Sequence, residues 1–256
     1  MAKVACAGKK HSAGWTPQAR VGKNGVHQTF LRGDCPEYVQ FPVSIVGEVA
    51  LSSTPRLLLR LLGSDYRELI KWEYVHIFWS DERSVSPENA QSNYRLAYEE
   101  LISKISIKTE NLHRIRGELT PVDAAKEYEL ELAGHFGSAA IPVFDLIILG
   151  LGEDGHTASL FPGAKALLEN KHLAVPTFSE SAGNWRVTIT PQVLNNASQI
   201  IFLVSGSSKA RIVGEILGKK QGHGYPAELL RPLHGYISWL IDAEAAAMIS
   251  DGNYES

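Results

Sequence analysis

Cysteine is nearly absent from this sequence of 256 residues, which contains only Cys6 and Cys35. Two thiols near one end exclude a disulfide-stapled scaffold and are typical of a protein from a reducing compartment such as the cytoplasm. The nine histidines are scattered, and no histidine or cysteine pair has the spacing of metal ligands. We therefore predict that the protein holds no metal.

Long apolar runs and an excess of basic residues are also missing. The longest apolar stretches, such as residues 146–149 and 200–204, are far too short to cross a bilayer. The formal net charge is −3, so the molecule as a whole offers no basic field for nucleic acid. We expect neither a membrane protein nor a nucleic-acid-binding protein. A locally basic pocket for a small anion is still compatible with this composition.

Acidic residues are missing from the first 33 positions, which carry six Lys or Arg side chains. We interpret residues 1–42 as a divergent basic segment without regular structure, because a solvated charged leader has little apolar surface to bury. An organelle transit peptide is the alternative, since such peptides are rich in arginine and poor in acidic residues, although serine is scarce here. No apolar stretch follows the basic residues, so a secretory signal is not expected.

From residue 43 onward, short apolar runs alternate with segments of helical period. The runs predict strands buried on both faces at residues 75–79, 144–149, 186–189, 200–204 and 236–241, with a weaker candidate at 45–51. Helices are predicted at residues 56–62, 92–102, 124–136 and 209–217. This alternation predicts a single α/β domain over residues 43–256, with a largely parallel sheet and helices on both faces.

Polar side chains follow four of the predicted strands, at the edge where open parallel sheets bind ligands. Ser53 and Thr54 follow the first strand, and a charged triplet ending in Arg83 follows the second. A glycine-rich stretch ending in His156 follows the third, and a Gly-Ser-Ser turn with Lys209 follows another. Hydroxyl, carboxylate, imidazole and cationic groups are thus expected to meet at one edge.

The stretch from residue 150 to 156 is the strongest candidate for catalysis. Its three glycines, with Gly152 in the middle, let the backbone approach a ligand closely. The composition from Thr157 onward predicts a helix, whose first N–H groups and dipole favour an oxyanion or phosphate. His156 can act as a general base near neutral pH, and Asp154 can hold its imidazole in one tautomer. A glycine turn with a purely geometric role explains the pattern about equally well.

The remaining candidates also have ordinary structural explanations. Ser53 and Thr54, followed by a proline, fit a helix cap as well as a phosphate site. The triplet ending in Arg83 fits an exposed charged turn, although its place after a strongly apolar strand favours a side chain aimed at a ligand. Lys209 lacks the full phosphate-loop pattern around it, and Arg186 fits an edge-strand charge.

Five ordered motifs resemble the 6-phosphogluconolactonases. One is FDLIILGLGEDGHTASLFPG at residues 144–163, and HIFWSDERSVSPENAQSNY begins at residue 76. Arg186-Val187-Thr188 follows, then Leu203-Val204-Ser205-Gly206 with Lys209, then YPAELLRPLHGYISWLIDAEAA from residue 225. The resemblance covers residues 51–247, about three quarters of the chain.

This resemblance implies the fold of glucosamine-6-phosphate deaminase and ribose-5-phosphate isomerase. It also implies hydrolysis of 6-phospho-D-glucono-1,5-lactone to 6-phosphogluconate, in the oxidative pentose phosphate pathway, without cofactor or metal. We expect a cytoplasmic monomer. His156 is implied as the base that activates water, with Asp154 supporting it and Arg83 near the substrate. Substrate or phosphate binding is implied for five further residues: Ser53, Thr54, Gly152, Arg186 and Lys209.

At the first loop the sequence departs from the family pattern. Family members usually read Leu-Ser-Gly-Gly-Ser-Thr-Pro, whereas here Leu51-Ser52 runs directly into Ser53-Thr54-Pro55. Glycines at this place permit φ > 0 and close backbone approach to a phosphate. A catalytically impaired paralogue that binds sugar phosphates is therefore one alternative. A deaminase or isomerase of the same fold is another, although the Glu-Asp-Gly-His-Thr-Ala stretch favours the lactonase.

Overall fold

The computed structural model describes residues 43–47, 53–138, 141–218 and 222–249. Two predictions lie outside these residues. One is the irregular basic segment at residues 1–42, and the other is the shortened loop between residues 48 and 52, where the two family glycines are missing.

Six strands of the described residues form one parallel sheet, in the order β4-β2-β1-β5-β8-β9. They are β1 (Val43–Gly47), β2 (Val75–Trp79), β4 (Leu112–His113), β5 (Leu146–Leu149), β8 (Gln199–Val204) and β9 (Tyr236–Ile241). The prediction of a largely parallel sheet is confirmed. β1 begins two residues before the weak candidate strand, and β4 is too short to leave a pattern in the sequence.

A smaller antiparallel sheet contains β3 (Asp81–Arg83), β7 (Asn184–Ile189) and β6 (Ala174–Ser179), in the order β3-β7-β6. The prediction that residues 186–189 belong to the parallel sheet is therefore wrong. Their apolar pattern identifies a buried strand, but such a pattern cannot reveal which strands lie beside it.

The four predicted helices are present, with ends shifted by a few residues. The α-helices are α1 (Ser53–Gly63), α2 (Asn93–Glu100), α3 (Pro121–Phe136), α4 (Pro191–Leu194) and α5 (Ala210–Leu217). Short 3-10 turns include η5 (Lys165–Leu168), η6 (Ser207–Lys209) and η7 (Pro226–Leu229). Within the part of the chain that the structure describes, no helix is long and apolar enough to cross a bilayer.

The helix predicted from Thr157 onward is wrong. This segment forms turns with an isolated bridge between Thr157 and Leu160, and the next helical residues are the single turn of η5. Pro162 and Gly163, which has φ +74°, interrupt the segment before a helix can propagate.

In the core, α3 packs against the end of β2 and forms hydrogen bonds with it. Phe78, Trp79 and Tyr128 are almost completely buried. The Tyr128 hydroxyl donates to the Trp79 carbonyl oxygen at 2.8 Å and accepts from the Trp79 N–H at 3.0 Å. Burial raises the pKa of Tyr128, so the hydroxyl keeps its proton and makes both bonds. These two hydrogen bonds fix the backbone of Trp79, the last residue of β2, and so help to position β3, which follows it.

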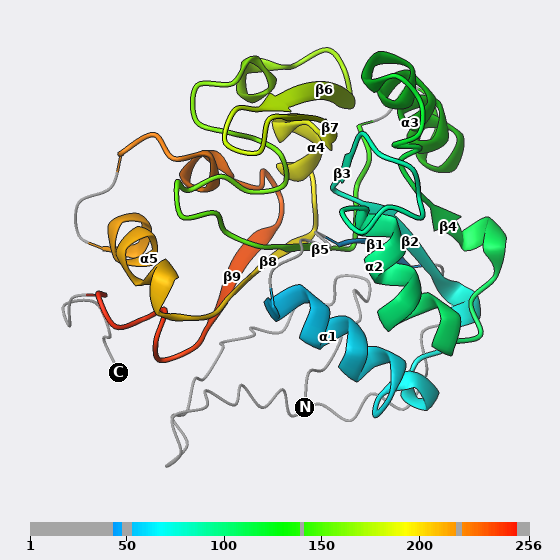
Figure 1. Cartoon of the computed structure of the whole chain (residues 1–256), viewed down its shortest axis with the longest axis horizontal. Helices are drawn as coiled ribbons and strands as arrows, with labels where there is room; N and C mark the ends of the chain where they lie inside the picture. The colour runs from blue at the N-terminus through cyan, green and yellow to red at the C-terminus, as the bar shows by residue number, and fades with distance from the viewer. Residues whose placement is uncertain (1–42, 48–52, 139–140, 219–221, 250–256) are drawn as a thin grey trace, which may run out of the picture. The chain divides into compact units, whose positions relative to one another are not determined.

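Glu100, at the end of α2, joins this helix to α1, and the two lie side by side (Figure 1). Its side chain is 7% exposed and lies 2.6 Å from Arg56 Nε and 3.3 Å from Arg60 Nε. Hydrogen bonding from Arg60 outweighs the effect of burial and lowers the pKa of Glu100 to about 2.

We expect Glu100→Gln to lower the free energy of unfolding by about 2 kcal/mol at pH 7, because both arginines lose their charged partner. The folded-state pKa lies below the unfolded value, so this contribution is present above pH 4.5 and lost as the pH falls toward about 2. Urea titrations from pH 7 to pH 3 measure the change. The matched control is Glu99→Gln, whose half-exposed pair with Arg95 is worth less than about 1 kcal/mol. A Glu100→Gln deficit that stays constant with pH would contradict this account.

Candidate active site

All the predicted site residues except Arg186 lie in segments that follow the carboxyl ends of the parallel strands. β2, β1, β5 and β8 are neighbours that run in the same direction. Their carboxyl ends lead to β3, α1, the His156 loop (residues 150–156) and η6. Ser53 and Thr54 are the first two residues of α1. The predicted binding of phosphate by their side chains lies outside what the structure describes.

His156 closes this loop, and its imidazole lies against the carboxylate of Asp154. Nδ1 is 2.5 Å from Asp154 Oδ1, and the His156 backbone N–H donates to the same oxygen at 3.2 Å. Hydrogen bonding from His156 lowers the pKa of Asp154 to about 2, so the carboxylate is ionised and can only accept. In the neutral imidazole, Nδ1 therefore carries the proton and Nε2 has the lone pair that a base needs.

Gly152 makes room for this pair. Its N–H donates to the His156 carbonyl oxygen at 2.8 Å, and its own carbonyl accepts from Gly155 at 3.0 Å. A Cβ at Gly152 would overlap the His156 ring and Asp154 Oδ1. The sequence predicts glycine here for close approach to a ligand, and the structure supplies a different reason, which is space for the imidazole and the carboxylate.

The other side of the His156 loop is held by the C-terminal part of the fold. Arg211 of α5 donates to the Glu153 carbonyl oxygen at 2.9 Å, and the Ala227 N–H of η7 donates to the Gly155 carbonyl oxygen at 3.1 Å. Gly155 has φ +79°, and the Tyr225 ring lies where its Cβ would be. Sequence analysis missed Arg211 and Tyr225 because nothing in a single sequence pairs them with a loop 58 or more residues earlier.

After His156 the chain turns toward the small sheet. Ser159 Oγ donates to Asp81 Oδ2 at 2.5 Å, which fastens this turn to β3. The Phe161 ring centroid lies 4.9 Å from that of His156 and 5.6 Å from Arg186 Cζ. The small sheet therefore brings Arg186 to the same neighbourhood as His156, whereas the anion site expected at a helix start does not form.

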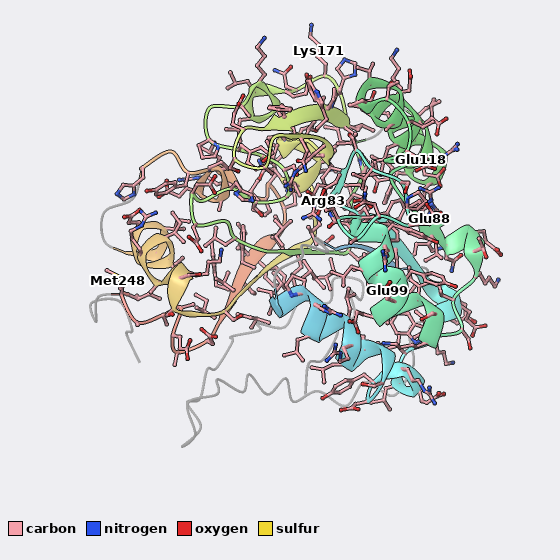
Figure 2. All side chains as sticks on the ribbon, viewed as in Figure 1. Arg83, Glu88, Glu99, Glu118, Lys171 and Met248 are labelled. Carbon is pink, nitrogen blue, oxygen red and sulfur yellow. The ribbon has the colours of Figure 1, made fainter. Side chains whose placement is uncertain are left out.

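The two interpretations of arginine as surface charge are wrong. Arg186 lies in the middle strand of the small sheet, with its side chain 14% exposed and Nη1 3.9 Å from Asp81 Oδ2. Arg83 lies in β3 and is 7% exposed; its position is labelled in Figure 2. Arg83 Nη1 donates to the Gln91 carbonyl oxygen at 2.5 Å, but its buried Nε has no hydrogen-bond partner among the described residues.

Glu82 explains why β3 can bury three charged residues in a row. Its carboxylate accepts from the backbone N–H groups of Arg83, Asn93 and Tyr94 and from Ser92 Oγ, at 2.7–3.0 Å. Asn93 begins α2, so the carboxylate meets the positive end of that helix dipole. Burial nevertheless raises the pKa of Glu82. The Glu82 carboxylate thereby holds the backbone of Arg83 in place. Its partners at residues 92–94 lie about ten residues later, and no sequence pattern predicts this pairing.

Lys209 ends η6, directly beyond β8, and is half-buried. The turn before it is held by Asp242, whose carboxylate accepts from the Gly206 N–H at 3.0 and 3.1 Å. Gly206 has φ +94°, which the Gly-Ser-Ser pattern accommodates. No ion pair joins Lys209 to a residue that the structure describes, so its ammonium is available to an anion at the carboxyl edge.

The model of the family described as glucosamine-6-phosphate isomerases/6-phosphogluconolactonase matches residues 47–239, about three quarters of the chain. The chain belongs to this family. The match runs from Gly47, the last residue of β1, to Trp239 in β9, so it includes every other strand of both sheets in full.

Relatives within this family are similar over most of their length. The 6-phosphogluconolactonase of Haemophilus influenzae is 40% identical over 201 residues, 77% of this chain and 84% of that protein. The 6-phosphogluconolactonase of a Synechocystis strain is 40% identical over 205 residues, 78% of this chain and 83% of that protein. The solved 6-phosphogluconolactonase of Trypanosoma brucei is 32% identical with a TM-score of 0.72, covering 81% of this chain and 86% of that one.

A monomeric glucosamine-6-phosphate deaminase of known structure has the same fold as this chain. It is 23% identical, with a TM-score of 0.62, and covers 80% of this chain and 87% of that one. The expected likeness to the deaminase fold is thereby confirmed. At this level of identity the likeness concerns the fold and carries no argument about the reaction.

Proposed function

We propose that this chain hydrolyses 6-phospho-D-glucono-1,5-lactone to 6-phosphogluconate, a step of the oxidative pentose phosphate pathway, with His156 as the general base. The observation that carries the proposal is the His156–Asp154 pair at the carboxyl edge of the sheet, with Nδ1 bound to an ionised carboxylate and Nε2 left as the acceptor. Lactone hydrolysis needs a positioned water, a base and donors for the developing oxyanion. The 40% identity to 6-phosphogluconolactonases supports this choice of substrate.

The proposed reaction proceeds by addition and elimination. Water attacks the lactone carbonyl carbon while His156 Nε2 takes its proton, and the carbonyl oxygen becomes an oxyanion. Asp154 stabilises the imidazolium that forms, because its carboxylate stays ionised. The oxyanion then re-forms the carbonyl, the bond from carbon to the ring oxygen breaks, and the departing oxygen takes the proton from Nε2. The product is an open-chain acid and the base is regenerated.

Arg83 is the proposed cation beside the reacting group. Its guanidinium is buried in β3, and Nε is a donor without a partner in the described structure. A buried donor of this kind is costly unless a ligand satisfies it, which is what a substrate oxygen would do. We propose that Arg83 binds the substrate near the lactone carbonyl. We also propose that Gly152 lies beside the substrate, where it leaves space for the His156 ring.

Lys209 and Arg186 are the proposed phosphate ligands, together with Ser53 and Thr54 at the start of α1. Lys209 is expected to contribute equally to binding of substrate and transition state, because the phosphate lies far from the reacting carbonyl. Lys209→Ala should therefore raise KM by ~10–100-fold, the value of one charged hydrogen bond, and leave kcat nearly unchanged. Initial rates over a range of lactone concentrations measure this. Lys171→Ala, at an exposed position, is the matched control, and a loss confined to kcat would contradict the role.

The decisive test of the reaction compares three measurements on the full chain. Lactone consumption above the spontaneous rate supports the lactonase. Tight binding of 6-phosphogluconate without turnover would instead establish a non-catalytic sugar-phosphate binder, the outcome that the shortened loop at residues 48–52 leaves open. Release of ammonia from glucosamine 6-phosphate would establish a deaminase.

We propose that residues 43–256 form the catalytic domain, that residues 1–42 take no part in the reaction, and that the enzyme acts as a cytoplasmic monomer. Two cysteines in 256 residues are consistent with a reducing compartment. Gel filtration and the activity of a chain that starts at Val43 test these points.

A further inference from the structure

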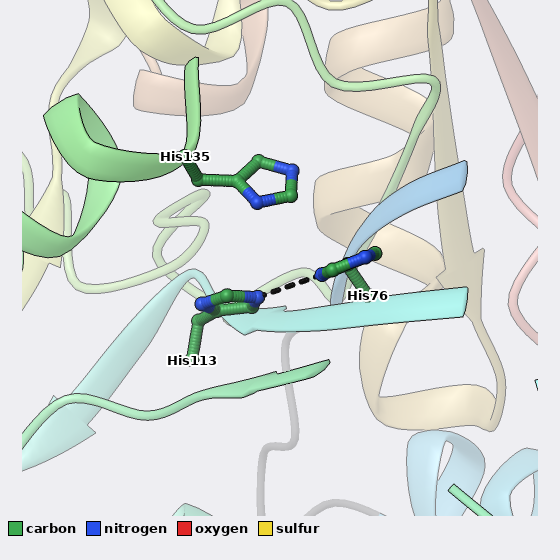
Figure 3. Close-up of side chains that lie close together, drawn as sticks. All are labelled: His76, His113 and His135. Carbon is green, nitrogen blue, oxygen red and sulfur yellow. Dashed lines mark hydrogen bonds between the residues drawn. The ribbon is translucent and has the colours of Figure 1, made fainter. Parts of the chain in front are cut away.

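Three histidines from different elements meet near the amino ends of β1 and β2, away from the carboxyl edge that carries His156. His76 lies in β2, His113 in β4 and His135 in the last turn of α3 (Figure 3). One ring nitrogen from each lies within 4.8 Å of the other two. The histidines that look scattered in the sequence therefore form a cluster in the fold, which sequence spacing cannot reveal.

His113 is oriented by a carboxylate from outside the cluster. Its Nδ1 lies 2.6 Å from Glu131 Oε1, so Nδ1 carries the proton and Nε2 keeps a lone pair. That Nε2 faces His76, with a distance of 2.9 Å to His76 Nδ1 (Figure 3). A histidine that donates one ring N–H to a carboxylate and presents the other nitrogen inward has the arrangement typical of a metal ligand.

His135 is oriented in a similar way by a hydroxyl group. Its Nε2 lies 3.0 Å from the Oγ atom of Ser44, which is 5% exposed. Nδ1 is then the nitrogen left to face the other two imidazoles, and Figure 3 shows the His135 ring above them with one nitrogen directed down. Glu131 and His135 lie four residues apart on the same face of α3, so one helix supplies both a ligand and the carboxylate behind another.

Packing against an aromatic ring keeps the imidazoles in place. The Phe78 ring stacks on His113 with centroids 4.1 Å apart and meets the edge of His135 at 5.1 Å.

We propose that His76, His113 and His135 form a site for a divalent transition-metal ion, with Zn²⁺ the best match. Imidazole nitrogens suit Zn²⁺, Ni²⁺ and Cu²⁺, whereas Mg²⁺ and Ca²⁺ need several oxygen ligands. Three imidazoles and one water complete a tetrahedral Zn²⁺ site. At zinc–nitrogen bonds of ~2.0–2.1 Å the nitrogens of a tetrahedral site lie ~3.3 Å apart. The His76 and His113 nitrogens, 2.9 Å apart, would separate slightly, and the wider pairs, which lie within 4.8 Å, would close in.

Binding requires one proton to move. In the metal-free cluster the proton shared by His76 and His113 lies on His76 Nδ1, because His113 Nε2 can only accept. When the metal takes both nitrogens, His76 carries its proton on Nε2, and no net proton is lost. The ion would join β2, β4 and α3 directly, so its expected effect is on stability and not on the reaction at His156.

Equilibrium dialysis of the full chain against Zn²⁺ after treatment with a chelator tests the site. All proteins carry His156→Ala, which removes the active-site imidazole, and Cys6, Cys35 and the other histidines stay as a common background. The parent, which carries only His156→Ala, should bind one more Zn²⁺ per chain than the protein that also carries His135→Gln. Zn²⁺ should raise the Tm of the parent by several degrees more than the Tm of that variant. His172→Gln, which alters an exposed histidine paired with Glu129, should leave the Zn²⁺ count unchanged.

Two further measurements keep the outcome clear. His76→Gln provides a second variant should His135→Gln not fold, as judged by circular dichroism. Co²⁺ in place of Zn²⁺ should give the visible absorption of a tetrahedral site in the parent only. Equal Zn²⁺ counts and equal Tm shifts in the parent and in a folded cluster variant would overturn the proposal.

Discussion

Replacement of His156 by alanine is expected to lower kcat for lactone hydrolysis by ~10²–10⁴-fold, the usual contribution of a positioned general base. The expectation rests on Asp154, which fixes the ring proton on Nδ1 and leaves Nε2 for the attacking water. KM should change little, because the imidazole contacts the water and not the phosphate. The formation of 6-phosphogluconate above the spontaneous rate measures the effect.

The matched control is His172→Ala. His172 also pairs with a carboxylate, Glu129 at 3.2 Å, but its side chain is 60% exposed. This variant should keep full activity. If His156→Ala retains wild-type kcat while remaining folded, the base lies elsewhere and the proposed mechanism is wrong.

Gly152→Ala is expected to lower the activity by ~10²-fold or more, although His156 and Asp154 themselves are unchanged. A small displacement of a reacting group is enough to lower the rate by this factor. The new methyl group would occupy the space of the His156 ring and Asp154 Oδ1. Both belong to side chains that can swing outward, so the free energy of unfolding should fall by no more than about 1 kcal/mol. Activity and stability should therefore separate.

Gly134→Ala provides the comparison for that experiment. Gly134 lies inside α3, and a Cβ there meets nothing within 4 Å. The substitution should leave kcat unchanged and raise stability by ~0.5–1 kcal/mol, the difference in helix propensity. Wild-type kcat in Gly152→Ala would show that the imidazole does not need its observed position.

Local patterns predicted five of the six strands of the parallel sheet and four helices, but failed for the small antiparallel sheet and for the turns after Thr157. β2 and β9 occur at the predicted residues, since each is an apolar run long enough to be recognised. β3 reads as a charged turn because its burial depends on β7, about one hundred residues later, and on the carboxylate cap that Glu82 forms on α2. The helix expected after Thr157 fails because tertiary hydrogen bonds, such as that from Ser159 to Asp81, compete with helix formation.

The candidate site shows the same division. The Asp154–His156 pairing could be predicted, since two residues of separation place a carboxylate within reach of its neighbour's ring. The burial of Arg83 and the position of Arg186 beside Phe161 could not, because both depend on the small antiparallel sheet. The histidine cluster could not be predicted either, because its members come from β2, β4 and α3, which are far apart in the sequence.

Because α5 and η7 hold the His156 loop, a C-terminal truncation could affect activity without removing a catalytic residue. A chain cut before Tyr225 would still contain the proposed base, its carboxylate and both strands of the small sheet that carry arginine. It would lack the ring against Gly155 and the Ala227 N–H that holds the Gly155 carbonyl. Such a fragment would also lack β9 and Asp242, so its inactivity would not imply that the lost residues touch the lactone.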